Sequence, residues 1–225
     1  MKKIAVIIGA LLVLASCGKE ESSIQFTFSG VNTSLKTTQT NAVAEVDITD
    51  FRLSIRDVEF KLDESDLDST EVQFRGPYDV DLMSETDALS QTIGEEPVEA
   101  GTYKVLRFKL HKSRDREPSH PLYDRSVFMS GTINGIPFEF WHDTSENFDV
   151  ENTEGIIVAD NMVSVVVRFN MDHLLSSVHT IDLAQAIDEN QDGTIEINPD
   201  DGDGNKEIAD QLKENIKMAA DLIKE

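Results

Sequence analysis

Apolar and polar residues alternate one by one in run after run between residues 22 and 169, and this alternation limits the fold more than any other feature. The clearest run is residues 101–110, GTYKVLRFKL. Strict alternation turns one row of side chains toward a core and the other toward water, as in a half-buried β-strand. About nine such runs, with turn residues between them and no helical pattern among them, predict an antiparallel β-sandwich over residues 24–170.

The spacing of these runs is similar to that of immunoglobulin-like and related β-sandwiches. The alternation shifts by one residue at Arg56 and Asp57, which predicts a β-bulge. Asn134 and Gly135 between two runs predict a tight hairpin. The polar residues 83–98 and the charged residues 111–121 are expected to be loops. The runs themselves fall at residues 22–30, 42–48, 51–62, 72–74, 78–82, 101–110, 126–133, 136–141 and 162–169.

After residue 170 the spacing of apolar residues becomes helical. Residues 171–178 and 181–187 are expected to form short helices, and residues 207–224 a longer amphipathic helix. The apolar residues of the longer helix recur at steps of three to four, at Ile208, Leu212, Ile216, Ala219 or Ala220, and Ile223. We expect residues 171–225 to be a helical extension that packs on the sandwich through this stripe. The alternative is that the stripe docks on another protein.

The first residues form a separate segment. Lys2 and Lys3 precede an apolar run, and small residues then lead to Cys17, the only cysteine. This order resembles the lipobox of bacterial lipoproteins. The resemblance implies a signal peptide over residues 1–16, a lipid on the Cys17 thiol and a tether over residues 17–23. The alternative, a retained transmembrane helix, would need roughly 20 apolar residues, more than this run supplies.

The residues after the cysteine, Lys19, Glu20 and Glu21, resemble the signal that sends bacteroidete-type lipoproteins to the outer face of the outer membrane. The alternative is a generic polar tether on a lipoprotein that faces the periplasm. The whole layout is similar to that of uncharacterised bacteroidete-type β-sandwich lipoproteins. That resemblance implies a compartment and a fold, and it leaves the activity open.

The chain is strongly acidic, with a formal net charge of −23. A field of this sign repels nucleic acids and anionic lipid surfaces, which are therefore poor partners. Divalent cations suit it better.

Residues 188–196, DENQDGTIE, have the spacing of a calcium loop. Oxygen-bearing side chains fall at positions 1, 3 and 5, and Gly193 at position 6 permits the sharp turn. The segment resembles the loops of EF-hand and dockerin modules, and the resemblance implies structural Ca²⁺. It departs from them at position 12, where Pro199 replaces a bidentate acid. The candidate ligands are Asp188, Asn190, Asp192, Thr194 and Glu196.

A second acidic set follows directly and repeats the alternating oxygen spacing. It is the weaker candidate because Lys206 occupies the position where the first loop has glycine. For both sets the alternative is a solvated acidic turn that holds no ion. The candidate ligands of the second set are Asp201, Asp203, Asn205 and Glu207.

Other motifs are sparse. The histidines share no metal-ligand spacing and are expected at the surface: His111, His120, His142, His173 and His179. No nucleophile elbow or phosphate-binding loop is present in the sequence. Trp141, which alternation places opposite Phe138 and Phe140, is a candidate for stacking on a sugar. The alternative is a core aromatic at the sheet edge.

These observations favour a membrane-anchored surface lipoprotein that binds a glycan or a protein without catalysis and contains structural calcium. One alternative is a structural subunit of an envelope or uptake assembly that docks through the last helix. Another is a carboxylate-based hydrolase, which requires a concave site with two carboxylates, one of them with a raised pKa.

Overall fold

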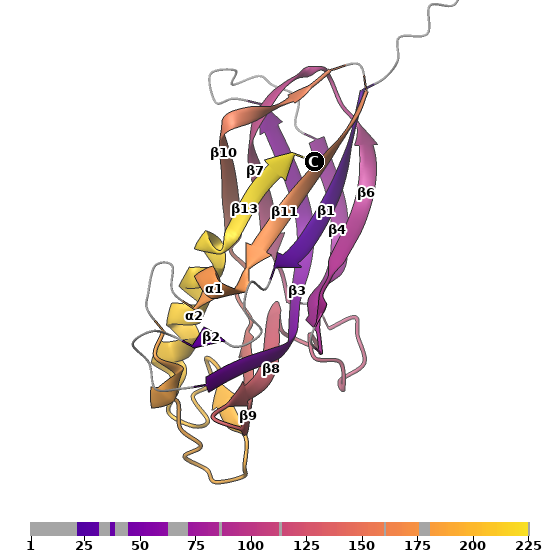
Figure 1. The fold of residues 1–225 in the computed structure, drawn as a ribbon. Helices are drawn as coiled ribbons and strands as arrows, with labels where there is room; N and C mark the ends of the chain where they lie inside the picture. Colours follow the sequence, from indigo (N-terminus) through magenta and orange to yellow (C-terminus); the bar gives the residue numbers. More distant parts are fainter. Residues whose placement is uncertain are drawn as a thin grey trace, which may run out of the picture.

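The computed structural model describes residues 22–31, 37–38, 45–62, 72–85, 87–112, 114–159, 161–175 and 181–224. Within them, two β-sheets pack face to face, with short helices beside one end (Figure 1). The predicted β-sandwich is therefore confirmed. The predicted signal peptide, Cys17, the export signal and His179 lie outside the described residues.

The first sheet has the strand order β13-β11-β1-β6. β1 is parallel to β11, and the other two pairs are antiparallel. The strands are β1 (Ser23–Val31), β6 (Ser90–Pro97), β11 (Met162–Asn170) and β13 (Ala220–Lys224).

The second sheet follows the order β10-β7-β3-β8-β9-β12, and β4 pairs with the other edge of β3. Its pairs are antiparallel except β9 with β12. The long strands are β3 (Glu45–Leu62), β4 (Val72–Ser84), β7 (Gly101–Leu110), β8 (Val127–Ile133), β9 (Ile136–His142) and β10 (Asn147–Val158). The short ones are β2 (Thr37–Thr38), β5 (Asp87–Ala88) and β12 (Ile195–Ile197).

β3 is 18 residues long and pairs with two strands, β8 and β7, along one of its edges. Its first half pairs with β8 and its second half with β7, and the register shifts between Ile55 and Val58. This shift confirms the predicted β-bulge. The predicted hairpin is also confirmed, because Asn134 and Gly135 have φ values of 53° and 81°, as the mirror-image hairpin turns require.

The loop between β7 and β8 is tied down by Arg116. Its guanidinium donates to Asp79 Oδ2 at 2.6 Å and to Ser54 Oγ at 3.0 Å. Ser54 is fully buried on β3 beside the bulge. The predicted loop at residues 111–121 is thus present, and this contact fixes it on β3 and β4.

Two of the longer strands, β6 and β10, lie where the sequence predicted none. Residues 83–98 are not a loop, because β4 continues to Ser84 and β6 occupies residues 90–97. β6 is an edge strand with mostly exposed side chains, so it needs no apolar alternation. β10 alternates between buried and exposed residues at Phe148 and Val150. Its pairing with β7 is interrupted after Glu151, and the alternation in the sequence is therefore too short to indicate the whole strand.

The helical predictions were too long. The short helices are α1 (Met171–Leu174) and the 3₁₀-helix η1 (Leu183–Gln185), and the long helix is α2 (Lys206–Met218). Residues 220–224, predicted as the end of that helix, form β13 instead. They complete the open edge of β11, and tertiary pairing of this kind outweighs local helix propensity.

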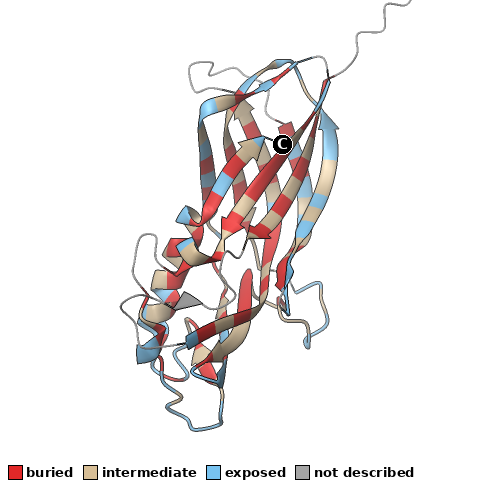
Figure 2. Cartoon of the chain, in the orientation of Figure 1, coloured by how far each residue is buried: buried red, intermediate tan, exposed pale blue. Residues whose placement is uncertain are grey.

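The core lies between the two sheets, and buried residues alternate with more exposed ones along strands such as β1 (Figure 2). Aromatic rings dominate its centre. The Phe169 ring lies 6.4 Å from Phe28, 6.3 Å from Phe51 and 6.0 Å from Phe108, measured between ring centroids. Offset and edge-to-face contacts of this kind stabilise aromatic pairs beyond their buried area.

Side chains close both edges of the first sheet against the second. At β13, Asn152 Nδ2 donates to the Leu222 carbonyl at 3.0 Å. At β6, Gln91 Nε2 donates to the Asp79 carbonyl at 2.8 Å. Unpaired sheet edges invite strand addition, so these contacts reduce the room for a partner strand there.

The apolar stripe of α2 packs on the sandwich, as predicted. Ala209, Leu212 and Ile216 are fully buried in the common core, and Asn215 Nδ2 donates to the Leu174 carbonyl at 2.9 Å. The stripe is therefore not free to dock on another protein. No helix in the described part of the chain is long and apolar enough to cross a membrane.

Candidate functional site

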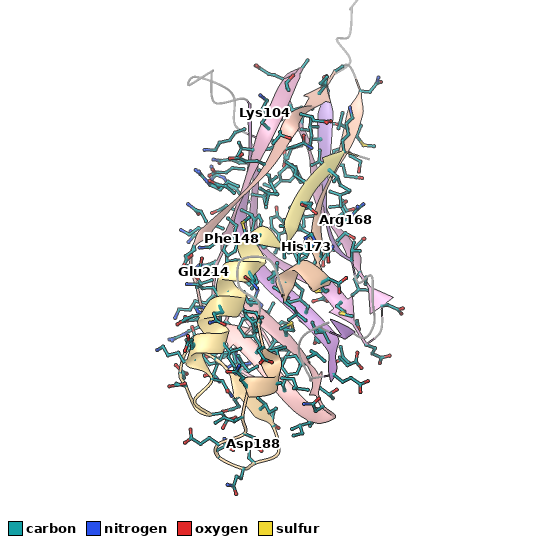
Figure 3. The ribbon with its side chains drawn as sticks, turned by 60° about the vertical axis from the view of Figure 1, so that its left-hand side comes forward. Lys104, Phe148, Arg168, His173, Asp188 and Glu214 are labelled. Atoms are coloured by element: carbon teal, nitrogen blue, oxygen red, sulfur yellow. The ribbon has the colours of Figure 1, made fainter. Side chains whose placement is uncertain are left out.

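The acidic loop at residues 188–194 lies at the end of the molecule away from the start of β1 (Figures 1 and 3). Gln191 and Gly193 have φ values of 62° and 94°, which wind the backbone into a tight turn. Glycine adopts such values at no steric cost. The predicted turn at position 6 of the loop is therefore present.

The three strongest predicted ligands point into this turn. Asp188 accepts from Asp192 N at 3.2 Å and from Gly193 N at 2.9 Å. Asn190 Oδ1 accepts from Asp192 N at 2.8 Å, and Asp192 Oδ1 accepts from Thr194 N at 2.9 Å. The side chains of positions 1 and 3 thus meet at one backbone N–H, that of Asp192, while the carboxylate of position 5 bonds to the next part of the loop.

Glu196, at position 9, lies in a field of negative charge. Burial raises the pKa of its carboxyl, and the charges of Asp203, Asp192 and Glu139 raise it further. The guanidinium of Arg125 acts in the opposite direction. Like charges held this close favour a proton or a cation among them.

Asp203, predicted in the second set, is fully buried and braces the first loop. Its Oδ1 accepts from Asn190 N at 3.2 Å and its Oδ2 from Glu196 N at 2.8 Å. It therefore ties together the backbone on both sides of the turn. No local pattern in the sequence distinguishes this carboxylate from its acidic neighbours.

Asn205 is the second brace and is only 2% exposed. Its Oδ1 accepts from Ile187 N at 3.0 Å, and its Nδ2 donates to the carbonyls of Ile187 at 2.7 Å and Glu196 at 2.8 Å. Asn205 thus joins the two ends of the 188–196 loop. It precedes α2 but makes no side-chain capping bond to that helix.

The remaining members of the second set lie apart. Asp201 Oδ1 accepts from Lys206 N at 2.9 Å, and Glu207 is exposed on the first turn of α2. Among the described residues, no three His, Cys, Asp or Glu side chains are grouped so that they could hold a metal ion. Both ion sites therefore stay predictions, and in the structure Asp203 and Asn205 brace the backbone of the first loop.

Position 12 of the loop offers no acid side chain. Pro199 occupies it, and its carbonyl accepts from Lys206 Nζ at 3.1 Å. Asn198 Oδ1 accepts from the backbone N–H groups of Asp200 and Asp201 at 3.0 and 3.2 Å. An EF-hand would have its bidentate acid at position 12. Here the chain makes a turn instead and continues to Asp203.

Trp141 lies on β9 on the face opposite the buried Phe138 and Phe140, as predicted. The guanidinium of Arg125 lies 4.8 Å from the Trp141 ring centre and 6.0 Å from that of Phe128. This cation–π contact occupies one position over the indole ring. A sugar stacked on Trp141 would have to share the ring with Arg125.

Glu139 and Glu196 are direct neighbours on the parallel strands β9 and β12. This places two carboxyl groups on one sheet face, and the pKa of Glu196 is raised. A pair of this kind was the requirement for a hydrolase. The open pocket that the structure describes is lined by other residues, between η1 and α2.

His142 is buried between β9 and α2, contrary to the expectation of a surface histidine. Its Nδ1 accepts from Thr144 N at 3.1 Å, and its Nε2 lies 3.7 Å from Asp210 Oδ1. Burial lowers the pKa of His142 and Lys213 lowers it further, while Asp143 and Asp210 act in the opposite direction. Alternation along β9 places His142 on the same face as the buried Phe138 and Phe140, so this pattern was the signal that could have indicated its burial.

An ionic cluster fastens α2 beside His142. Glu146 binds Lys213 at 3.2 Å and Lys217 at 2.8 Å, and these contacts lower the pKa of Glu146 to about 2. Lys217 also lies 5.7 Å from the ring centre of Phe148 on β10. Figure 3 shows Glu214 on α2 and Phe148 close to the same part of the helix.

The burial of His142 predicts a pH dependence of stability. The folded protein takes up this proton at a lower pH than the unfolded chain, whose histidines titrate near 6.5. The stability contributed by neutral His142 is therefore complete above pH 6.5 and is lost as the pH falls through the folded-state pKa. We expect His142→Asn, which keeps an acceptor for Thr144 N–H, to flatten the decline in unfolding free energy between about pH 7 and 5.

Urea denaturation at a series of pH values measures this slope. His173→Asn is the matched control, because His173 is exposed on α1. Equal slopes for the two variants would contradict the prediction.

Comparison with known proteins gives one match. A family model described as "Domain of unknown function (DUF4382)" matches residues 29–199. No curated protein and no solved structure matches the chain. The matched region begins inside β1, contains the 188–196 loop and ends before α2.

Proposed function

The chain belongs to the DUF4382 family, and we propose that it is a lipid-anchored, non-enzymatic binding module with a structural calcium ion. In this proposal the Cys17 thiol carries the lipid, and the protein faces the exterior of an outer membrane. A glycan or a protein is the ligand. The proposals for the anchor, the ion and the ligand are argued from the residues of this chain and not from the family assignment.

The observation that carries the proposal is the turn at Gly193, whose backbone N–H groups are bonded by the side chains of Asp188, Asn190 and Asp192 at positions 1, 3 and 5. Calcium prefers oxygen ligands from such alternating positions. The buried Asp203 and Asn205 hold this loop in shape without an ion. An ion would then enter a loop that is already ordered.

The position of the loop supports a binding role away from the membrane. β1 begins at one end of the sandwich and the acidic loop lies at the other (Figure 1). A tether that precedes Ser22 would hold the β1 end toward the membrane. The loop and the hairpin of β8 and β9 would then face outward.

The alternatives receive less support. A subunit that docks through α2 would need an exposed apolar stripe, and Leu212 and Ile216 are fully buried. A hydrolase is favoured only by the Glu139 and Glu196 pair, which would need a substrate cleft around it.

Thermal unfolding of residues 18–225 in millimolar Ca²⁺ and in excess EDTA tests the proposal. A ligand at 100 times its Kd stabilises the native state by about 2.7 kcal/mol. For a chain of this size that corresponds to a Tm increase of about 5–10 °C. We expect this increase for the parent chain and its loss in Asp188→Ala and in Asp192→Ala.

Glu189→Ala is the matched control, since Glu189 is an exposed acid of the same loop at a position without a ligand role. We expect it to keep the calcium-dependent increase. An equal Tm with and without calcium would contradict the proposed ion site, and equal losses in all three variants would reduce the effect to general charge screening.

A further inference from the structure

An open pocket of about 330 Å³ lies between η1 and the first turns of α2. This volume is at the lower end of the range for ligand pockets, about 300–1,000 Å³. The lining residues are Asp182, Gln185, Ile187, Gly204, Asn205, Glu207, Ile208 and Gln211. Asn205, which lines the pocket, also bonds the backbone of Ile187 and Glu196 at the two ends of the 188–196 loop.

One wall of the pocket is formed by Ile187, a large apolar side chain that is exposed to solvent. Ile187 is 52% exposed, while its backbone N–H and carbonyl are both bonded to the buried Asn205 side chain. Ile208, partly buried on α2, lines the same pocket. Two aliphatic surfaces are thus presented by a rigid backbone.

The polar lining is acidic and amidic, and no lining residue is basic. Asp182 is fixed in place, because its carboxylate accepts from Ala184 N at 3.1 Å and from Gln185 Nε2 at 3.0 Å. Glu207 is exposed and makes no ion pair within the described part of the chain. The amides of Gln185 and Gln211 add further carbonyl acceptors.

We propose that this pocket binds a lysine or arginine side chain of a partner polypeptide. The aliphatic stem would pack on Ile187 and Ile208, and the cationic head would meet Asp182 and Glu207. Long basic side chains combine an apolar stem with a charged head in this way. The net charge of −23 would steer a basic partner toward the protein.

The inference names the class of partner for the binding module proposed above, and it rests on that role. A protein partner is favoured over a glycan at this site because no aromatic ring lines the pocket. The pocket is also small and acidic, which suits a single basic side chain.

Titration of the ¹⁵N-labelled chain with N-acetyl-arginine amide and N-acetyl-lysine amide, followed by NMR, tests the proposal. N-acetyl-norleucine amide, which has an apolar stem without the charge, is the ligand control. We expect saturable shifts confined to residues 182–187 and 204–211 with the basic probes, and much smaller shifts with the control. Asp182→Asn and Glu207→Gln should each weaken binding about two- to fivefold, as expected for an exposed ion pair.

Asp221→Asn removes the same charge from the exposed side of β13 and should weaken binding by less than either pocket variant. Shifts scattered over the surface, equal shifts with the norleucine probe, or equal effects of all three variants would overturn the proposal. The titration is repeated in EDTA, so that a missing calcium site and a missing basic-side-chain site give separate results.

Discussion

Asn205→Ala is expected to lower the free energy of unfolding by about 2–3 kcal/mol. The variant loses three hydrogen bonds, to Ile187 N–H, the Ile187 carbonyl and the Glu196 carbonyl. Each intramolecular hydrogen bond contributes about 1 kcal/mol, and buried groups left without a partner cost more. Ile187 is exposed, so water can reach its backbone groups in the variant. The expected loss is therefore smaller than it would be if all three groups stayed buried without a partner.

Urea denaturation measures the loss, with Asn161→Ala as the matched control. Asn161 is exposed in the turn before β11, where its backbone N–H donates to the Ala159 carbonyl at 2.8 Å. We expect the control to change the unfolding free energy by less than about 0.5 kcal/mol. A loss for Asn205→Ala within that range would show that the loop does not depend on this brace.

Asn205→Ala also tests whether calcium binding depends on the order of the 188–196 loop. Asn205 contributes no predicted ligand to the 188–196 turn, yet it joins the two ends of that segment. In Asn205→Ala the ion would have to order a looser loop, and part of its binding free energy would go to that ordering. We therefore expect a smaller calcium-dependent increase in Tm than in the parent chain, with Asp188 and Asp192 still present.

The sequence predicted the strands whose two faces differ most in burial. β1 alternates cleanly because every second side chain lies in the core and the others are more exposed. The hairpin at Asn134 and Gly135 was predictable because few residue pairs accept two positive φ values. The bulge in β3 was visible as a change of phase at Arg56 and Asp57.

The elements that were missed depend on contacts distant in the sequence. β6 is mostly polar, with Ile93 as its one residue packed against the core, and it is a strand because it pairs with β1. Residues 220–224 continue the spacing of α2, but pairing with the free edge of β11 makes them a strand. Local patterns contain no information about an open edge elsewhere in the chain.

The candidate site divides in the same way. The turn at residues 188–193 was predictable because its side chains bond to backbone groups within five residues. The braces were not, since Asp203 and Asn205 act on residues up to 18 positions away. Both were predicted as ligands because an oxygen-bearing side chain looks the same in sequence whether it meets an ion or a backbone N–H.

Phe169→Ala is expected to cost about 3–5 kcal/mol, the typical range for a fully buried phenylalanine. The Phe169 side chain is 0% exposed and contacts the rings of Phe28, Phe51 and Phe108 from both sheets. Its removal leaves a cavity between the sheets that rigid strands cannot fill, so the cavity adds to the lost transfer free energy. Phe169→Leu, which keeps most of the volume, should cost less than half as much.

Met162→Ala is the matched control, because Met162 lies on the same strand and is 55% exposed. Urea denaturation of the three variants gives the comparison, and a constant m-value would show that the unfolded states are equivalent. Phe169 also directly precedes Asn170, whose side chain caps α1. Because one β11 residue joins both sheets beside the start of the helical segment, we expect the loss to appear as one cooperative transition. A separate early transition of α1 and α2 would contradict the single core that joins them to the sandwich.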